Sequence, residues 1–263
     1  MNYFLIFAFL FFIGSCLGWC MELFFRRFIS VNNPERVWIN PGFLTGPYLP
    51  LYGFGLWGMY EVSRLIELMM TDMIYLNILI IFAVMAVIMT VIEYIAGLIF
   101  VRGMNVKLWD YSSERFNVKG VICLKFTLIW GALGTVYFFT LNNRVENWVE
   151  WLSHHLTFSF FIGMFFGVFA VDLGYTLQIS VKIRRFAAEN DIVVKYEELK
   201  HFLRTQRLEM KEKSRFLLAF KTDRPLHEHL ERYFEQRMEK SRQKLEEARE
   251  DVMEKIKSRR HSE

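Results

Sequence analysis

Residues 73–101 read MIYLNILIIFAVMAVIMTVIEYIAGLIFV, and the only charged side chain among them is Glu93. A helix needs about 20 apolar residues to cross the hydrocarbon core of a bilayer, so this stretch is long enough to span a membrane. Lipid offers the backbone no hydrogen-bond partners, and a helix satisfies its N–H and C=O groups internally. The stretch therefore predicts a membrane-embedded α-helix and sets the class of the whole chain.

The overall composition agrees with a membrane protein that carries a polar tail. Hydrophobic residues make up 53% of the 263 positions, and the mean hydropathy is +0.20. Residues 1–181 contain 10 of the 32 Lys/Arg and 11 of the 28 Asp/Glu, so they carry a net charge of −1 and residues 182–263 carry +5, which together give the formal +4. This contrast excludes disordered, collagen-like and disulfide-scaffold proteins. The three cysteines lack zinc-site spacing, and the sequence predicts no metal site and no cofactor.

Loop charges set the predicted number of membrane spans. We predict five spans, at residues 3–25, 47–70, 73–101, 121–141 and 156–181. The second is the weakest because it contains three charged side chains. Lys and Arg near span ends prefer the cytoplasm, and with five spans the basic residues alternate between the two sides. The sequence thus predicts an all-α membrane protein with its N-terminus outside, a transmembrane domain over 1–181 and a helical cytoplasmic tail over 182–263.

Four ionisable side chains lie inside the predicted spans, where a charge costs at least about 2.5–3.5 kcal/mol. Glu22 has Arg26 one turn further on, an arrangement that favours a local ion pair. Glu93 has no basic residue within a turn, and we expect Lys125 of the next span to be its partner. Buried ion pairs and a transport or catalytic site are both open interpretations. The predicted polar pocket consists of Glu22, Glu93, Lys125 and Asp172.

A proline- and glycine-rich loop interrupts the entry into the second predicted span. Four of the five prolines and five of the fifteen glycines fall between residues 34 and 58. Irregular backbone at membrane depth is tolerated only against protein or a water-lined cavity, so we expect this loop to line the polar pocket. The alternative is a proline-kinked helix start with close glycine packing. The predicted lining residues are Asn40, Gly42, Gly46, Pro47, Tyr52 and Gly53.

The loop between the third and fourth predicted spans has a related pattern. We expect Trp109, Asp110 and Asn117 to close over the entrance beneath Glu93. In the alternative interpretation Asp110 caps a turn and Trp109 lies at the membrane interface. Each of the two loops carries Trp, Asn and Gly and follows a helix with one glutamate. A duplicated helical hairpin and the ordinary recurrence of such residues in membrane proteins both explain the similarity.

Several of these motifs together resemble a known bacterial family, the putative ABC-transporter type IV family. The resemblance covers about residues 14–135 and implies a multi-pass, permease-like protein of a bacterial plasma membrane. Two positions depart from the family pattern: Pro41 stands where members carry arginine, and Val101 where they carry a second glutamate. The motifs that carry the resemblance are Gly18-Trp19-x-x-Glu22, Asn40-x-Gly42-Phe43-x-x-Gly46-Pro47, Glu93-Tyr94-x-x-Gly97, Trp109-Asp110-Tyr111-Ser112 and Phe116-Asn117-x-x-Gly120.

The predicted tail lacks motifs for nucleotide chemistry. The sequence has no phosphate-binding Gly-x-x-x-x-Gly-Lys-Ser/Thr loop, so ATP hydrolysis would require a partner.

The basic side chains of residues 182–185 favour anionic lipid headgroups. A helix with an apolar stripe is predicted over residues 225–256, folding back on residues 196–220. Acidic residues are interleaved with the basic ones, which argues against nucleic-acid binding.

These features lead to one preferred function and two alternatives. The preferred one is a permease-like or transport-associated membrane protein with an intramembrane polar pocket. The first alternative is a membrane-embedded enzyme that uses Glu93 and Asp110 on a lipid-linked substrate. Between the two classes, the sequence favours a protein without enzymatic activity. The second is a non-catalytic scaffold whose tail recruits a cytoplasmic partner, for example an ATPase, or a second copy of the chain. A dry, fully paired core would favour the scaffold.

Overall fold

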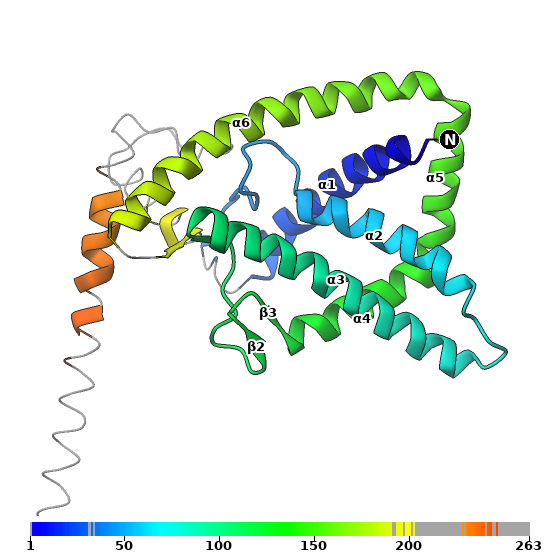
Figure 1. Ribbon diagram of the computed structural model, residues 1–263, viewed down its shortest axis with the longest axis horizontal. Helices are drawn as coiled ribbons and strands as arrows, with labels where there is room; N and C mark the ends of the chain where they lie inside the picture. The colour runs from blue at the N-terminus through cyan, green and yellow to red at the C-terminus, as the bar shows by residue number, and fades with distance from the viewer. Residues whose placement is uncertain are drawn as a thin grey trace, which may run out of the picture. The chain divides into compact units, whose positions relative to one another are not determined.

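The computed structural model describes most of the chain up to residue 196 and short parts of the remainder. In that described part, the chain is mostly helical and divides near residue 197 into two compact units. The first unit holds all the elements discussed below, and Figure 1 shows their order along the chain. The described residues are 2–30, 33, 35–190, 193–196, 198–200, 202, 228, 230–239, 241–243 and 246.

The first two helices form a closely packed hairpin. Helix α1 spans Tyr3–Phe28 and α2 spans Pro50–Glu67. Proline suits the first turn of α2 because the N–H that it lacks would have no helical partner there. A side chain at Gly53 of α2 would meet the hydroxyl of Ser15 and lie 2.7 Å from the carbonyl oxygen of Phe11. Glycine is therefore required where the two backbones approach each other.

The next two helices form a second hairpin, and short strands lie in the connection between them. Helix α3 spans Ile74–Met104 and α4 spans Leu124–Thr140. The connection between them contains β1 (Val106–Lys107) and an antiparallel pair of short strands, β2 (Asn117–Val118) and β3 (Ile122–Cys123). Two glycines of α4 lie directly against α3, so small residues again set the distance between the helices.

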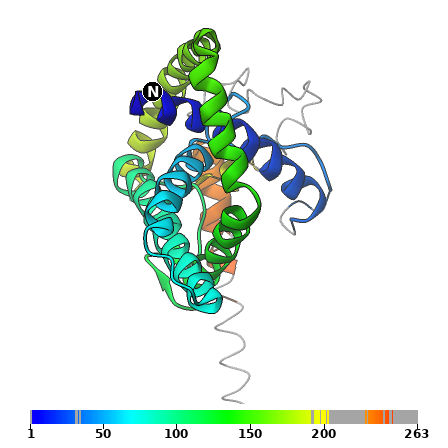
Figure 2. The same cartoon turned by 90° about the vertical axis from the view of Figure 1, so that its right-hand side faces the viewer.

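Two further helices complete the unit. Helix α5 (Asn142–His154) follows α4 at an angle of 62° and crosses the end of the first hairpin where α1 begins (Figures 1 and 2). A 3-10 turn, η1 (Leu156–Phe158), leads into the long helix α6 (Ser159–Glu189). Strand β4 (Val194–Lys195) then pairs in parallel with β1. The segment after α6 is thereby hydrogen-bonded to the connection between α3 and α4.

The helix lengths support a membrane protein but not the predicted number of spans. Three helical stretches are long and apolar enough to cross a membrane: α1, α3 and the η1–α6 stretch Leu156–Glu189. A fourth results if α4 and α5 are one bent span, and these counts refer only to the described residues. Helix α2 has 18 residues, three of them charged, and does not qualify. The count of five spans is therefore not confirmed and stays a prediction.

Three other predictions were incomplete. We expected an outer loop after residue 141, yet residues 142–154 form α5, because Val145, Val149 and Leu152 are buried on one helical face. Helix α6 continues past residue 181, since Ile183 and Phe186 extend its buried face. The all-α prediction omitted the short strands β1–β4, which are held by backbone hydrogen bonds rather than by an alternating apolar pattern.

The second unit is described only in part. Residues 230–239 are helical, the Tyr233 hydroxyl donates to Glu198 at 3.2 Å, and the rings of Phe202 and Tyr233 lie 5.9 Å apart. Most of the residues predicted to fold back, and the end of the apolar stripe at residues 247–256, lie outside the described residues. The cytoplasmic location of the tail stays a prediction.

The close approach of α1 and α2 at Gly53 is testable. We expect Gly53→Val to destabilise the purified protein by about 1–3 kcal/mol, the usual cost of overpacking, because its side chain meets backbone as well as the hydroxyl of Ser15. The measurement is thermal unfolding in detergent. Gly163→Val is the control, because no atom lies within 4 Å of a Cβ placed there. Equal stability of the two variants would contradict the packing described.

Candidate functional site

The proline- and glycine-rich loop is held by one carboxylate from α6. Asp172 is buried and accepts hydrogen bonds from the backbone N–H groups of Thr45, at 3.2 Å, and Gly46, at 2.9 Å. The Tyr48 hydroxyl donates to it at 2.6 Å, and the hydroxyls of Thr45 and Thr176 donate as well. A buried carboxylate is tolerated when such donors surround it. These contacts join α6 to residues far away in the sequence and fix the loop that enters α2.

The same loop is also fixed by the buried side chain of Asn40. The indole N–H of Trp19 on α1 donates to Asn40 Oδ1 at 2.8 Å, and the Gly42 N–H donates to the same oxygen at 3.1 Å. Asn40 Nδ2 in turn donates to the carbonyl oxygens of Leu44 and Thr45. The predicted lining residue Asn40 therefore stabilises the conformation of the loop through hydrogen bonds to it. Its hydrogen bonds replace those that a continuous helix would make.

Glu22 forms the local ion pair predicted from its spacing and has a second partner on α2. Arg26 Nε lies 2.9 Å from Glu22 Oε1, which confirms the prediction. The Tyr52 hydroxyl donates to Glu22 Oε2 at 3.0 Å. The predicted lining residue Tyr52 thus lies in the helical hairpin, where it joins the end of α1 to the start of α2.

Glu93 is buried on α3 and takes its partners from two aromatic side chains. The Tyr111 hydroxyl donates to Glu93 Oε1 at 2.9 Å, and Trp130 Nε1 donates to Oε2 at 3.0 Å. Burial, reinforced by the Glu93 carboxylate, raises the pKa of Tyr111 above its usual range, so the hydroxyl remains a donor. The rings of Trp130 and Tyr52 lie 6.3 Å apart, which places the partners of Glu93 and Glu22 next to each other.

The predicted pairing of Glu93 with Lys125 is wrong. Lys125 Nζ lies 3.0 Å from Glu114 Oε1, and the Lys125 side chain is 59% exposed. Lys125 is the second residue of α4, so its amine points to the loop rather than into the bundle. Neutral donors satisfy Glu93 instead, and no lysine is required for that. Lys125 therefore does not belong to the buried polar groups.

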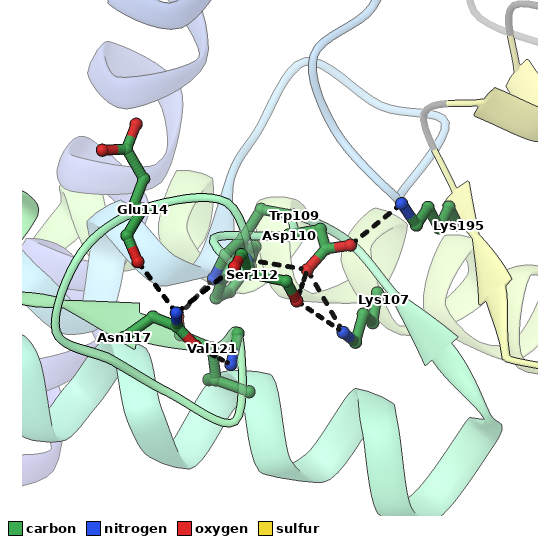
Figure 3. Close-up of polar contacts among 9 residues, drawn as sticks. Lys107, Trp109, Asp110, Ser112, Glu114, Asn117, Val121 and Lys195 are labelled. Carbon is green, nitrogen blue, oxygen red and sulfur yellow. Dashed lines mark hydrogen bonds and ion pairs between the residues drawn. The ribbon is translucent and has the colours of Figure 1, made fainter. Parts of the chain in front are cut away.

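A further polar cluster joins the loop between α3 and α4 to the segment after α6 (Figure 3). Asp110 accepts from Lys107 Nζ at 3.2 Å and from Lys195 Nζ at 3.0 Å, and Ser112 donates through its hydroxyl and its N–H. Burial alone would raise the pKa of Asp110, but the hydrogen bonds from Ser112, Lys195 and Lys107 outweigh it and hold the pKa below its usual range. Asp110 consequently links β1 and β4 through its ion pairs with Lys107 and Lys195.

The other two predicted residues of this loop support its shape. Asn117 Nδ2 donates to the carbonyl oxygen of Glu114 at 2.8 Å, and Asn117 Oδ1 accepts from the Gly120 N–H at 3.1 Å. Trp109 Nε1 donates to the carbonyl oxygen of Val121 at 2.8 Å. Figure 3 shows that these contacts close the loop on itself. The loop reaches Glu93 through Tyr111 rather than through Asp110 or Asn117.

The predicted polar groups Glu22, Glu93 and Asp172 line neither of two surface hollows in the described part of the chain. Glu22, Glu93 and Asp172 each hold a loop or a helix start, and their hydrogen bonds are to different sets of donors. Two surface hollows, of about 380 and 480 Å³, are lined mainly by apolar side chains such as Phe4 and Phe82. In the part of the chain that the structure describes, no cluster of three or more His, Cys, Asp or Glu could hold a metal ion.

The remaining loop residues act through backbone shape. A side chain at Gly46 would meet the ring of Tyr48, and one at Gly42 would lie 3.2 Å from Leu49 Cδ2. Pro47 stands between the residues that donate to Asp172, where it keeps the chain out of a helix. These positions are therefore packed inside the loop.

Sequence reasoning missed the donors of these carboxylates. Thr45, Tyr48, Tyr111 and Trp130 are neutral, and a search for opposite charges does not detect them. A second signal was present for Tyr111, because it belongs to the Trp109-Asp110-Tyr111-Ser112 motif that carries the family resemblance. Lys195, which pairs with Asp110, lies more than eighty positions away in the sequence and could not be assigned without the fold.

The sequence of this chain matches the model of a known family. A family model described as putative ABC-transporter type IV matches residues 9–177, which is more than half of the chain. The chain belongs to this family, as its motifs predicted. No curated protein and no solved structure matched the chain in the corresponding comparisons.

The low pKa of Asp110 gives a pH-dependent prediction. Its charge stabilises the fold fully above the unfolded pKa of about 3.9, and this contribution is lost as the pH falls toward the lower folded value. We expect Asp110→Asn to unfold at a lower temperature than the wild type at pH 7, by about 2–4 °C for each kcal/mol lost. The difference should shrink as the pH falls below 3.9, about where the unfolded carboxyl takes up its proton.

The control for this experiment is Asp72→Asn, in an exposed loop between α2 and α3. This substitution should change the unfolding temperature little, both at pH 7 and below pH 3.9. A constant difference between Asp110→Asn and the wild type across this pH range would show that the charge of Asp110 is not what stabilises the loop.

Proposed function

We propose that this chain is the permease-like membrane component of a bacterial transport system. The family assignment and the long apolar helices support a membrane protein associated with transport. In this proposal the protein crosses the plasma membrane several times, with its N-terminus outside and its tail in the cytoplasm. The basic residues 182–185 would then lie at the inner surface, close to anionic lipids.

The observation that carries the proposal is the pair of loops held by buried carboxylates at one end of the helices. Asp172 holds the loop before α2, and Glu93 holds the loop before α4 through Tyr111. A solute that crosses at this end requires both loops to move. The carboxylates would then exchange their present donors for water or solute, and the predicted pocket would open between them.

The free-energy cost of moving the two loops determines what must drive the opening. Each carboxylate loses several hydrogen bonds, and leaving a buried group without partners costs about 1–3 kcal/mol or more. A substrate or partner must therefore bind the open state more tightly than the closed state. Because the sequence has no phosphate-binding loop, any ATP hydrolysis in this proposal would be carried out by a partner protein.

One observation favours a second candidate, a non-catalytic scaffold. Glu22, Glu93 and Asp172 all have close hydrogen-bond donors, which is the pattern of a paired interior rather than of an exposed binding site. In this alternative the loops stay closed, and the helical tail recruits the partner. The enzyme hypothesis has no comparable support, because Glu93 and Asp110 have separate donors.

Glu93→Gln separates the transport proposal from the scaffold. The amide keeps the volume of the side chain but places an NH₂ group against the donors Tyr111 and Trp130. The substitution therefore weakens the contact that holds the loop before α4 closed, and it removes the negative charge that a passing solute would meet. We expect cells that carry only this variant to show the same changes in cellular solutes as cells without the protein. The measurement is a comparison of intracellular metabolite levels in deletion strains that express the wild type or a variant.

Glu150→Gln, on the exposed face of α5, is the matched control and should restore the wild-type profile. Expression and monodispersity of each purified variant show that it has folded. The transport proposal is wrong if Glu93→Gln restores the wild-type profile at normal expression, or if deletion itself changes no solute.

A further inference from the structure

Two carboxylates converge on a single amide at the opposite end of the helices from the loops. Asn142 begins α5 and is 2% exposed. Its Nδ2 lies 3.3 Å from Oε1 of Glu67, the last residue of α2, and 3.3 Å from Oε1 of Glu146, one turn along α5. Both distances are at the long end for N–H···O hydrogen bonds. One neutral amide group therefore stands between two acidic side chains.

Among the residues that the structure describes, neither Glu67 nor Glu146 forms an ion pair. Arg64, on the same helix as Glu67, lies over the ring of Tyr60, at 6.0 Å from its centroid. Like charges that share one site repel each other, so this arrangement favours a bound cation.

An independent observation points to a missing ligand at the same place. The Tyr137 hydroxyl, at the end of α4, is buried and has no hydrogen-bond partner, and Tyr137 as a whole is 4% exposed. Its electrostatic neighbours are Glu146 and Tyr60. Asn142 Oδ1 is buried without a partner as well. Each unpaired buried group costs about 1–3 kcal/mol, and both of these groups lie near Glu146, so they require an explanation.

We propose that Glu67, Glu146, Asn142 and Tyr137 form a binding site for a hard divalent cation, for which Ca²⁺ fits best. All four residues offer oxygen atoms, and Ca²⁺ takes six to eight oxygen ligands in a flexible geometry. The two carboxylates balance its charge. A half-turn of the Asn142 side-chain amide directs Oδ1 to the ion and removes Nδ2, because the two ends of an amide occupy nearly the same shape.

The small number of charged ligands sets the expected strength. Two carboxylates with neutral oxygens and water correspond to the weaker calcium sites, with a Kd of about 0.1–1 mM. Glu67 is exposed, so an ion can reach the site from the surrounding water. When bound, the ion would tie the end of α2 to the start of α5. This site is separate from the carboxylate-held loops, and its existence does not depend on the proposed function.

Calcium titration of the purified full-length protein in detergent tests the site. We expect saturable binding by calorimetry in the range of about 0.1–1 mM, and a rise in the unfolding temperature as Ca²⁺ saturates the folded state. Glu146→Gln should weaken binding at least about tenfold, as expected when one of two charged ligands is lost. Glu150→Gln, one turn further along α5, is the matched control and should bind as the wild type does.

Tyr137→Phe provides a second variant that changes no charge. Without Ca²⁺ it should be as stable as the wild type or more so, because it removes an unpaired hydroxyl. With Ca²⁺ it should bind several-fold more weakly, and this result decides the matter if Glu146→Gln does not fold. The proposal is overturned if the wild type shows no saturable binding, if Na⁺ at equal ionic strength gives the same shift, or if all variants bind Ca²⁺ alike.

Discussion

A carboxylate buried among apolar helices must find hydrogen-bond donors, and Asp172 finds them in a loop from a distant part of the chain. Its oxygens accept the backbone N–H groups of Thr45 and Gly46 and the hydroxyl of Tyr48. The need is mutual, because the broken backbone before α2 has N–H groups that no helix satisfies. One interaction thereby meets two requirements and fixes where α6 lies against the first hairpin.

A similar requirement explains the arrangement of the partly exposed Glu22 and the buried Glu93. Glu22 pairs with Arg26 and accepts from Tyr52, and Glu93 accepts from Tyr111 and Trp130, so each carboxylate adds a polar link between neighbouring elements. Apolar contact is a weak guide inside a membrane, because lipid tails are as apolar as the helices. Small residues such as Gly53 set how closely the helices approach, and the polar contacts determine which parts meet.

These closed contacts also limit how the protein could work. Loops that are hydrogen-bonded to buried carboxylates move only if something compensates the lost partners. Asp110 adds a further tie, through Lys195, between the second loop and the segment that leads toward the tail. A partner that pulls on this segment would act on the loop directly. The ion pair thus gives a direct physical connection between the segment after α6 and the loop before α4.

Local patterns in the sequence predicted much of this structure, and distant contacts accounted for most of the errors. The long apolar runs identified α1, α3 and α6, and the spacing of Glu22 and Arg26 identified their ion pair. Helix α5 was missed because its polar composition hid three buried positions. The partners of Glu93 and Asp172 were missed because they are neutral and distant in sequence, and because charge alone suggested Lys125.

Asp172 stabilises the fold through its contact with the loop before α2. A double-mutant cycle with Asp172→Ala and Tyr48→Phe measures this contact directly from the unfolding free energies of the two single variants and the double variant. The two side chains meet at 2.6 Å, and we expect a coupling energy of about 1.5–3 kcal/mol, the usual value for a hydrogen bond to a charged group. Additive effects of the two substitutions, within about 0.5 kcal/mol, would contradict the claim.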